Sequence, residues 1–241
     1  MFETVKIPKK IDDKCLLEAV VEIQFEPSVA EEAVFGILYS HLKNEFGKVE
    51  NLPLSQIPPQ FRNTAPDLIY KPYHKLSKPG FVVQIGNRVI SITTEGKYCG
   101  WDNFTKEIGD IILTLQKSEV VKEFKRLGVR YVNSFSETSL RDLNLTLKIG
   151  EDDIIDQPTN FVTVFATDEL KAVLRLSNNS RIGEKADEYK IIDIDVETSL
   201  EGKDFFQQHE KLILAAHDFE KKVFFGLLSP NFLKTLNPVY A

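Results

Sequence analysis

The chain has 241 residues, of which 42% are hydrophobic and 27% are charged, and its formal net charge is −6. This is the composition of a soluble globular protein with one large domain or two small ones. No apolar run approaches the roughly 20 residues that span a bilayer, and the N-terminus lacks the apolar region of a signal peptide. Because nucleic-acid-binding domains are more often basic, nucleic acid is not a favoured partner. We therefore expect a cytoplasmic protein that does not bind membranes.

Residues 16–25 predict the first strand. The odd positions of this stretch are all apolar, whereas Glu18, Glu22 and Gln24 occupy even positions. An alternation with a period of two indicates a strand that buries one face. A second stretch, residues 127–133, alternates in a similar way and places Arg130 on its less apolar face.

A helix and an extended connection are expected after the first strand. Ser28 and Glu31 have the spacing of a capping box, which predicts a helix from this point to Gly47. Residues 48–66 contain four prolines. Because proline fixes φ and removes a donor, we expect neither a strand nor a helix in this segment.

The rest of the first half predicts three strands and a long helix. The strands cover residues 67–76, 81–85 and 89–93, and the last two are joined by a Gly86-Asn87 hairpin turn. The helix begins near Trp101, and its apolar stripe continues to an end at Gly128, with Ser118 as an alternative point at which the helix breaks.

After the strand at 127–133, the second half predicts four more strands and two helices. The strands cover residues 143–147, 161–165, 170–176 and 189–196, with a turn at Asn178-Asn179. Residues 161–165 are apolar on both faces, which is typical of a central strand. A helix is expected over residues 204–225, and Ser229-Pro230 begins a short last helix.

This order of elements predicts an α+β fold. We expect two related halves of the β-α-β-β-β-α type, residues 1–126 and 127–241, which form a mainly antiparallel sheet packed by long helices. The two halves together are expected to make one compact unit.

Three carboxylates share one face of the strand at 189–196 and its end. Asp193, Asp195 and Glu197 alternate with apolar residues, and such a set can hold Mg²⁺ or Mn²⁺ in a hydrolase. The alternative is a solvated face laced by cross-strand ion pairs. On the neighbouring strand, Lys171 and Arg175 alternate so that their side chains are expected on the same face as the carboxylates, as this alternative requires.

A second candidate site joins the two alternating strands. If these strands lie near each other, Glu18, Glu22 and Arg130 form an ion network. Such a network lines a ligand-binding pocket or sets the strand register.

The common sequence motifs of catalysis and cofactor binding do not occur. There is no Gly-rich phosphate loop, nucleophile elbow or Cys/His metal pattern, and we expect no cofactor. The two cysteines are expected to be buried thiols.

Three motifs carry a resemblance to a known family: EAVVEIQF at 18–25, GWDNF at 100–104 and RLGVRYVN at 126–133. Together they resemble a sporadically distributed prokaryotic family of uncharacterised proteins of about this length. His217 followed by Phe224-Phe225 is similar to the family's C-terminal pattern. The chain departs from the family where Leu16-Leu17 replaces a proline-containing pair. The patchy distribution implies an accessory role in a mobile-element or defence-type system.

These observations favour a non-catalytic binding or interaction protein. Its partner is an unidentified protein or small molecule, and a homo-oligomer is possible. One alternative is a metal-dependent phosphodiester or nucleotide hydrolase that uses the three carboxylates with His217. Another is a sensor in which Arg130 reads a small anionic ligand.

Overall fold

The computed structural model describes residues 6–12, 15–62, 64–135, 139–181, 188–201 and 204–240. The first half contains these elements: β1 (Leu16–Pro27), α1 (Glu31–Leu42), β2 (Lys48–Asn51), the 3-10 helix η2 (Pro53–Gln56), α2 (Pro59–Arg62), β3 (His74–Lys78), β4 (Phe81–Ile85), β5 (Val89–Thr94) and α3 (Trp101–Ser118). The second half contains these: β6 (Val121–Phe135), the 3-10 helix η3 (Leu140–Asp142), β7 (Lys148–Ile149), β8 (Asp152–Asp153), β9 (Asn160–Ala166), β10 (Lys171–Arg181), β11 (Glu188–Ser199), α4 (Phe205–Leu227) and α5 (Pro230–Thr235).

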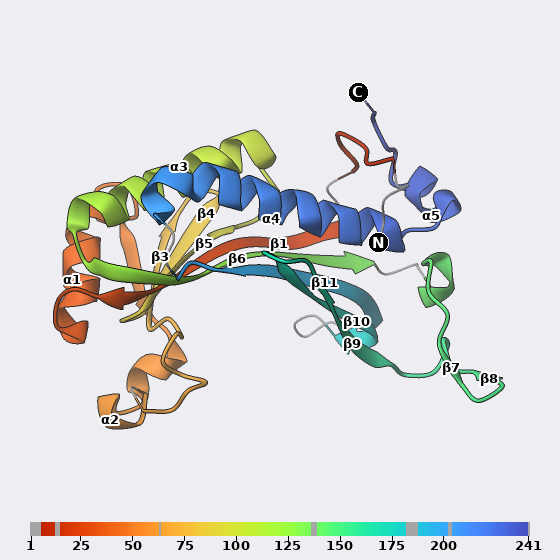
Figure 1. Ribbon diagram of the computed structural model, residues 1–241, viewed down its shortest axis with the longest axis horizontal. Coiled ribbons are helices and arrows are strands. Elements are labelled where there is room, and N and C mark those ends of the chain that lie inside the picture. Colours follow the sequence, from red (N-terminus) through yellow and green to blue (C-terminus); the bar gives the residue numbers. More distant parts are fainter. Residues whose placement is uncertain are drawn as a thin grey trace. The chain divides into compact units, whose positions relative to one another are not determined.

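The predicted α+β class is confirmed. In the described part of the chain, nine strands form a sheet in the order β2-β3-β4-β5-β1-β6-β11-β10-β9, and β7 and β8 form a separate hairpin (Figure 1). The two halves have a similar strand order. In each half the first strand, β1 or β6, lies at the middle of the sheet, and the last strand, β5 or β11, lies beside that first strand.

The chain divides into two compact units. The first unit comprises Met1–Glu18, Val129–Glu197 and Leu214–Ala241, and the second comprises Ala19–Gly128 and Thr198–Ile213. Strands β1, β6 and β11 and helix α4 therefore contribute residues to both units.

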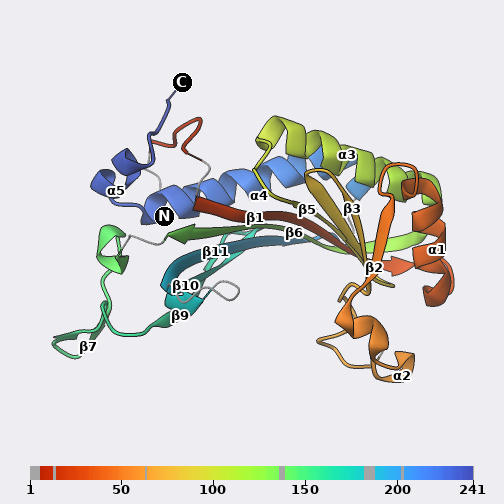
Figure 2. The same ribbon diagram turned by 180° about the vertical axis from the view of Figure 1, so that it is seen from behind.

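The second unit has its core between one face of its strands and its helices. The odd positions of β1 from Ala19 to Phe25 are buried, as the alternation predicts. Helix α3 presents a buried stripe that includes Phe104, Ile108 and Leu115. Figure 2 shows α3 along one face of these strands.

The first unit repeats this arrangement with its own residues. On β11 the even positions from Ile192 to Val196 are buried. The ring of Phe135 on β6 packs against Phe232 of α5 at a centroid distance of 5.1 Å. Helix α5 begins as the sequence predicts, because the backbone N–H of Phe232 donates to the Ser229 hydroxyl over 3.2 Å.

Several local predictions were wrong near helix ends. Helix α3 does not continue to Gly128 but ends at the alternative break point Ser118, because Glu119 adopts a left-handed conformation with φ of 52°, and Val121 starts a strand. The capping box does not form. The Ser28 hydroxyl donates instead to the Glu119 carbonyl over 2.6 Å, and α1 has Ala30 as its N-cap.

The segments around the prolines and in the second half also differ from prediction. Residues 48–66 contain β2, η2 and α2, since proline is tolerated in the first turn of a helix. The strand expected over 67–76 starts only at His74. No strand forms over residues 143–147, where Leu143 makes an isolated bridge to Leu228. Strand β10 continues through Asn178 with a register shift.

The position of one strand in the sheet was also predicted wrongly. The sequence indicates a central strand at 161–165, but β9 lies at one end of the strand order. Its side chains alternate between half-buried and exposed. Within the described ranges, no helix is both long and apolar enough to cross a membrane.

Candidate functional site

Strands β10 and β11 of the first unit bring together the charged residues that the sequence singles out. Burial of the even positions of β11 leaves Asp193, Asp195 and Glu197 on the opposite face. In the antiparallel register, Arg175 lies opposite Asp193 and Lys171 lies opposite Glu197. This is the cross-strand arrangement expected for a face laced by ion pairs.

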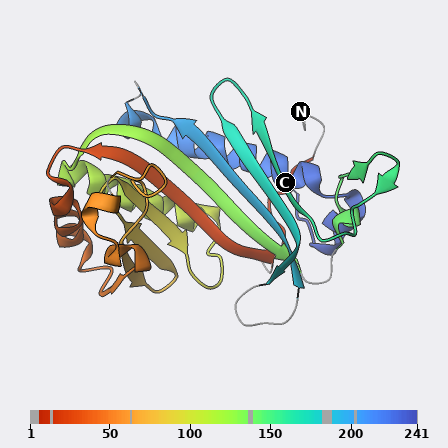
Figure 3. The ribbon, with the colours of Figure 1, turned by 90° about the horizontal axis from the view of Figure 1, so that it is seen from below.

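Strand β9 extends the same face with apolar side chains. Val162 pairs with Arg175, and Val164 pairs with Val173. Val162 is 61% exposed and Val164 is 49% exposed. Figure 3 shows β9, β10 and β11 from the side opposite the helix of this unit. We call this side the open face. Its members on β9, β10 and β11 are Val162, Val164, Ala166, Lys171, Val173, Arg175, Asp193, Asp195 and Glu197, and Arg130 of β6 joins them through its contact with Asp193.

Arg130 of β6 is bound tightly to Asp193. Its Nε and Nη2 donate to the two carboxylate oxygens of Asp193 over 2.7 and 2.9 Å. These hydrogen bonds raise the pKa of Arg130, although burial opposes the shift, and the negative charges of Asp193, Glu18 and Asp195 add to it. The pair therefore joins the two sites that the sequence predicts, because Arg130 belongs to the candidate ligand site and Asp193 belongs to the set of three carboxylates.

The other cations of the open face are also paired. Arg175 Nη1 lies 3.6 Å from Asp193 Oδ2, and Lys171 Nζ lies 2.8 Å from Glu197 Oε1. Two guanidinium groups therefore share the Asp193 carboxylate, which explains how a carboxylate on the open face is nevertheless almost fully buried.

The remaining members of the candidate ligand site belong to different units. Glu18 belongs to the first unit and acts on Arg130 through its charge. Glu22 belongs to the second unit, where its Oε1 accepts from Arg126 Nη1 over 3.0 Å and from Gln24 Nε2 over 2.8 Å. The nearest cation to Glu22 with a defined contact is thus Arg126.

Metal binding by the three carboxylates of β11 finds little support in the geometry. Across the residues that the structure describes, no group of three His, Cys, Asp or Glu side chains is arranged to hold a metal ion. The oxygens of Asp193 and Glu197 face arginine and lysine nitrogens, which occupy the positions that a cation would take.

Two titratable groups lie in the interior of the first unit, on α4. Burial lowers the pKa of His217 from 6.5 to about 3, and the charge of Lys221 adds to this shift. Burial raises the pKa of Glu220 from 4.5 to about 8, and Lys221 opposes that shift. The His217 ring packs against Tyr131 of β6 at a centroid distance of 5.5 Å. Both groups are therefore neutral at neutral pH.

Some residues of this site were missed at the level of sequence. Arg126 has the same parity as Arg130 on β6, but its strand was assigned to the end of a helix. Val162 and Val164 are exposed because β9 has only β10 as a neighbour in the strand order. A local pattern does not contain that information.

Comparisons with known proteins add little to this geometry. No protein-family model matches the chain, and no curated protein matches it. Among solved structures, the chain is similar to Methanococcus jannaschii TBP, with 15% sequence identity and a TM-score of 0.28. The similarity covers 85% of this chain and 98% of that chain. At this TM-score it supports no inference about this chain.

Proposed function

We propose that this chain is a non-catalytic binding protein that holds an extended polypeptide segment at β9 and the adjoining open face. The observation that carries the proposal is an unprotected edge strand. β9 lies at the end of the strand order, and its sequence, NFVTVFA, has neither charge nor proline. Edge strands usually carry such features, because free backbone groups otherwise pair with another chain.

The opposite end of the sheet provides a contrast within the same chain. β2 has only four residues and carries Lys48 and Glu50, which is a common way to protect an edge. β9 is longer and exposes two valines on one face. A partner strand that adds to β9 gains backbone hydrogen bonds, and its alternate side chains reach the valines.

The charges of the open face favour a polypeptide partner over nucleic acid. Arg130, Lys171 and Arg175 each contact a carboxylate of β11. Binding to a phosphate backbone needs cations that release counterions, and these cations are already neutralised. A surface of apolar side chains beside balanced charges resembles the composition of protein interfaces.

The test uses short peptides selected by phage display against the purified chain and measured by fluorescence anisotropy. We expect selected peptides to alternate apolar and polar residues and to lose binding when a central residue is replaced by proline. Val162→Lys combined with Val164→Lys is expected to raise the Kd at least about tenfold, since each buried valine contributes about 1.5 kcal/mol.

A matched control and three contrary outcomes define the test. Ile149→Lys changes an exposed apolar residue of the same unit on β7, and it should leave peptide binding unchanged. Equal affinity in the double valine variant would contradict the proposal. Binding to duplex DNA that weakens steeply with salt would replace it by nucleic-acid recognition. Self-association that the valine variant abolishes would make the occupant a second copy of the chain.

The metal-dependent hydrolase is the second candidate, since Asp195 and Glu197 lie on one strand face. Calorimetry with Mg²⁺ and Mn²⁺ tests it directly. Binding that Asp195→Asn abolishes while the unfolding midpoint is retained would favour the hydrolase. The accessory role in a mobile or defence-type system, the cytoplasmic location and the reading of an anion by Arg130 stay predictions.

A further inference from the structure

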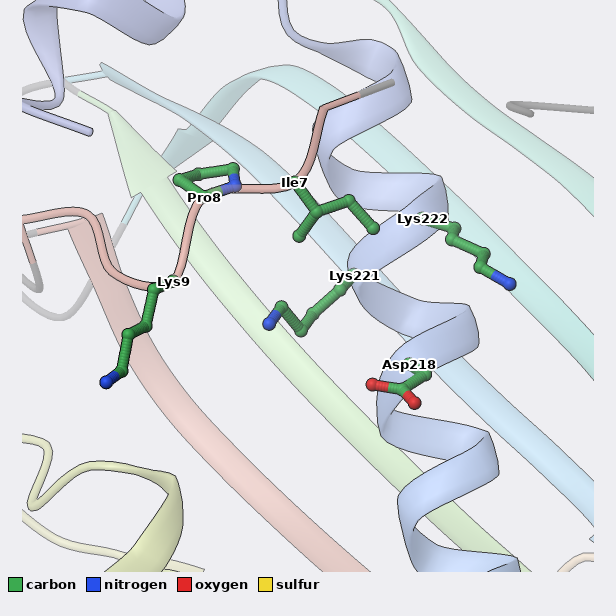
Figure 4. Close-up of a pocket in the computed structure, with 6 residues that line it drawn as sticks. All are labelled: Ile7, Pro8, Lys9, Asp218, Lys221 and Lys222. Carbon is green, nitrogen blue, oxygen red and sulfur yellow. The ribbon is translucent and has the colours of Figure 1, made fainter. Parts of the chain in front are cut away.

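The pocket between the N-terminal segment and α4 does not gather its charges around one position. It has a volume of about 390 Å³, and its lining residues are Ile7, Pro8, Lys9, Asp218, Lys221 and Lys222. Figure 4 shows Lys9 pointing away from Lys221, and Lys222 on the other side of the helix. A clearer asymmetry of charge in the first unit lies at the two ends of β9.

The chain on both sides of β9 is acidic. Residues 149–170 contain six aspartate or glutamate residues and no lysine, arginine or histidine. Because β9 itself is uncharged, all six carboxylates belong to the segments that flank the strand, and all six residues are exposed. They are Glu151, Asp152, Asp153 and Asp156 before the strand and Asp168 and Glu169 after it.

The C-terminal flank is the tight turn that joins β9 to β10. The N–H of Thr167 donates to the Leu170 carbonyl over 2.8 Å, and the N–H of Leu170 donates to the Thr167 hydroxyl over 3.0 Å. These hydrogen bonds close the turn and leave Asp168 and Glu169 at its exposed corner. Asp168 is two residues beyond Ala166, the last residue of β9, so their Cα atoms are at most about 7 Å apart.

The N-terminal flank is held in place from two sides. On one side, Asn178 of β10 donates from Nδ2 to the Gln157 carbonyl over 2.7 Å. On the other, Arg141 donates from Nη2 to Asp156 over 2.6 Å and from Nη1 to Asp153 over 2.9 Å. One guanidinium group thus faces two carboxylates, and this flank keeps a net negative charge.

The same carboxylates oppose the pairing of β9 with a second copy of the chain. Residues 161–165 read FVTVF, so an antiparallel pair centred on Thr163 matches phenylalanine with phenylalanine and valine with valine. Such a pair also places residues 168–170 of each copy opposite residues 156–158 of the other. The acidic turn of one copy then lies beside the acidic flank of the other, and like charges repel. Repulsion of this kind selects against one partner in favour of another.

We propose, on the basis of the proposed function, that the segment which pairs with β9 carries lysine or arginine at both of its ends. Its centre of about seven residues matches the length of β9, and the cations beyond that centre reach the carboxylates of the two flanks. Because both flanks are acidic, the same pattern fits a parallel and an antiparallel partner. Charges at the rim of an interface act mainly on the rate of association and on its salt dependence.

Three synthetic peptides with a common centre, TVTVTVT, test this pattern by fluorescence anisotropy with the full chain at low salt. Both ends of each peptide carry two lysines, two glutamines or two glutamates. We expect the lysine peptide to bind at least about tenfold more tightly than the glutamine peptide, since it gains several exposed ion pairs. The glutamate peptide should bind most weakly, and added salt should reduce the differences.

Asp168→Lys reverses one charge of the C-terminal flank at an exposed position outside β9. It should weaken the lysine peptide and strengthen the glutamate peptide by about threefold each, whereas damage to the strand would weaken both. Asp218→Lys is the matched control, because it makes the same change at an exposed position of α4 in the same unit. It should leave both affinities unchanged, and circular dichroism establishes that each variant is folded.

The contrary outcomes separate this proposal from the proposed function. Equal affinity of the three peptides, or an Asp168→Lys variant that binds them as the wild type does, would overturn the basic pattern alone. The glutamine peptide tests the edge itself, because it has no charge to interact with the new lysines of Val162→Lys combined with Val164→Lys. If that double variant binds it unchanged, the proposed function fails. Absence of binding by all three peptides at about millimolar concentration would overturn both.

Discussion

Arg130 on β6 holds Asp193 on β11 with two parallel hydrogen bonds, Nε to Oδ1 over 2.7 Å and Nη2 to Oδ2 over 2.9 Å. The Asp193 side chain is 8% exposed and that of Arg130 is 42% exposed. Bidentate pairs of this kind fix geometry as well as adding energy. The contact therefore joins β6 to β11 at a defined position.

Replacing the buried member of this pair should be costly. We expect Asp193→Asn to lower the free energy of unfolding by about 1–3 kcal/mol, because it leaves the two guanidinium groups of Arg130 and Arg175 without their shared charge. Urea denaturation measures the change. Lys171→Met breaks the more exposed pair with Glu197 and should cost less than about 1 kcal/mol. Equal losses in the two variants would contradict the structural role assigned to the Arg130–Asp193 pair.

Glu220 should make the protein less stable as the pH rises. Burial raises its pKa from 4.5 to about 8, so between these values the folded carboxyl keeps a proton that the unfolded one has lost. Its contribution to stability is complete below pH 4.5 and is lost as the pH rises toward 8. Glu220→Gln should remove this decrease of stability with pH. At pH 8 its free energy of unfolding should exceed that of the wild type by more than about 1 kcal/mol.

Urea denaturation across this pH range checks the prediction for Glu220. Glu210→Gln, at an exposed position of the same helix, is the control and should keep the slope of the wild type. A slope that survives in Glu220→Gln would show that the buried carboxyl is not its source.

His217 should act in the opposite direction. Burial lowers its pKa from 6.5 to about 3, with a smaller effect from Lys221, so the unfolded imidazole takes up a proton that the folded one excludes. The contribution of His217 to the free energy of unfolding is fully present above pH 6.5 and is lost as the pH falls toward 3. We expect His217→Gln to shift the midpoint of acid unfolding, followed by circular dichroism, to lower pH. An unchanged midpoint would contradict this prediction.

Gly86 in the β4–β5 turn should not tolerate a larger residue. A Cβ there would meet the carbonyl oxygen of Lys71 and lie 2.8 Å from Val89 Cγ1. We expect Gly86→Ala to destabilise the fold by about 1–3 kcal/mol, since backbone has to move. Gly47→Ala has no atom within 4 Å of the added Cβ and should change the stability by less than about 1 kcal/mol. Thermal unfolding of the two variants compares them directly, and a neutral Gly86→Ala would refute the steric argument.

The parts of the fold that follow from alternation were predictable. The buried odd positions of β1, the hairpin around Gly86 and the carboxylate face of β11 all depend on neighbours in sequence. The pairing of Lys171 with Glu197 was also predictable, because alternation along the two neighbouring strands places both side chains on one face. The sequence did not decide between an end of α3 at Ser118 and one at Gly128, because the apolar residues beyond Ser118 continue a helical spacing although they belong to a strand.

The sequence by itself determined which face of each main strand is apolar, since the period of two and burial are both local properties. Only the tertiary structure decided that Arg130 meets Asp193, 63 residues later, and that Arg126 is the partner of Glu22. It also placed β9 at an edge of the sheet. Strand order and the meeting of distant segments depend on how the whole chain packs, and no short window of sequence contains that information.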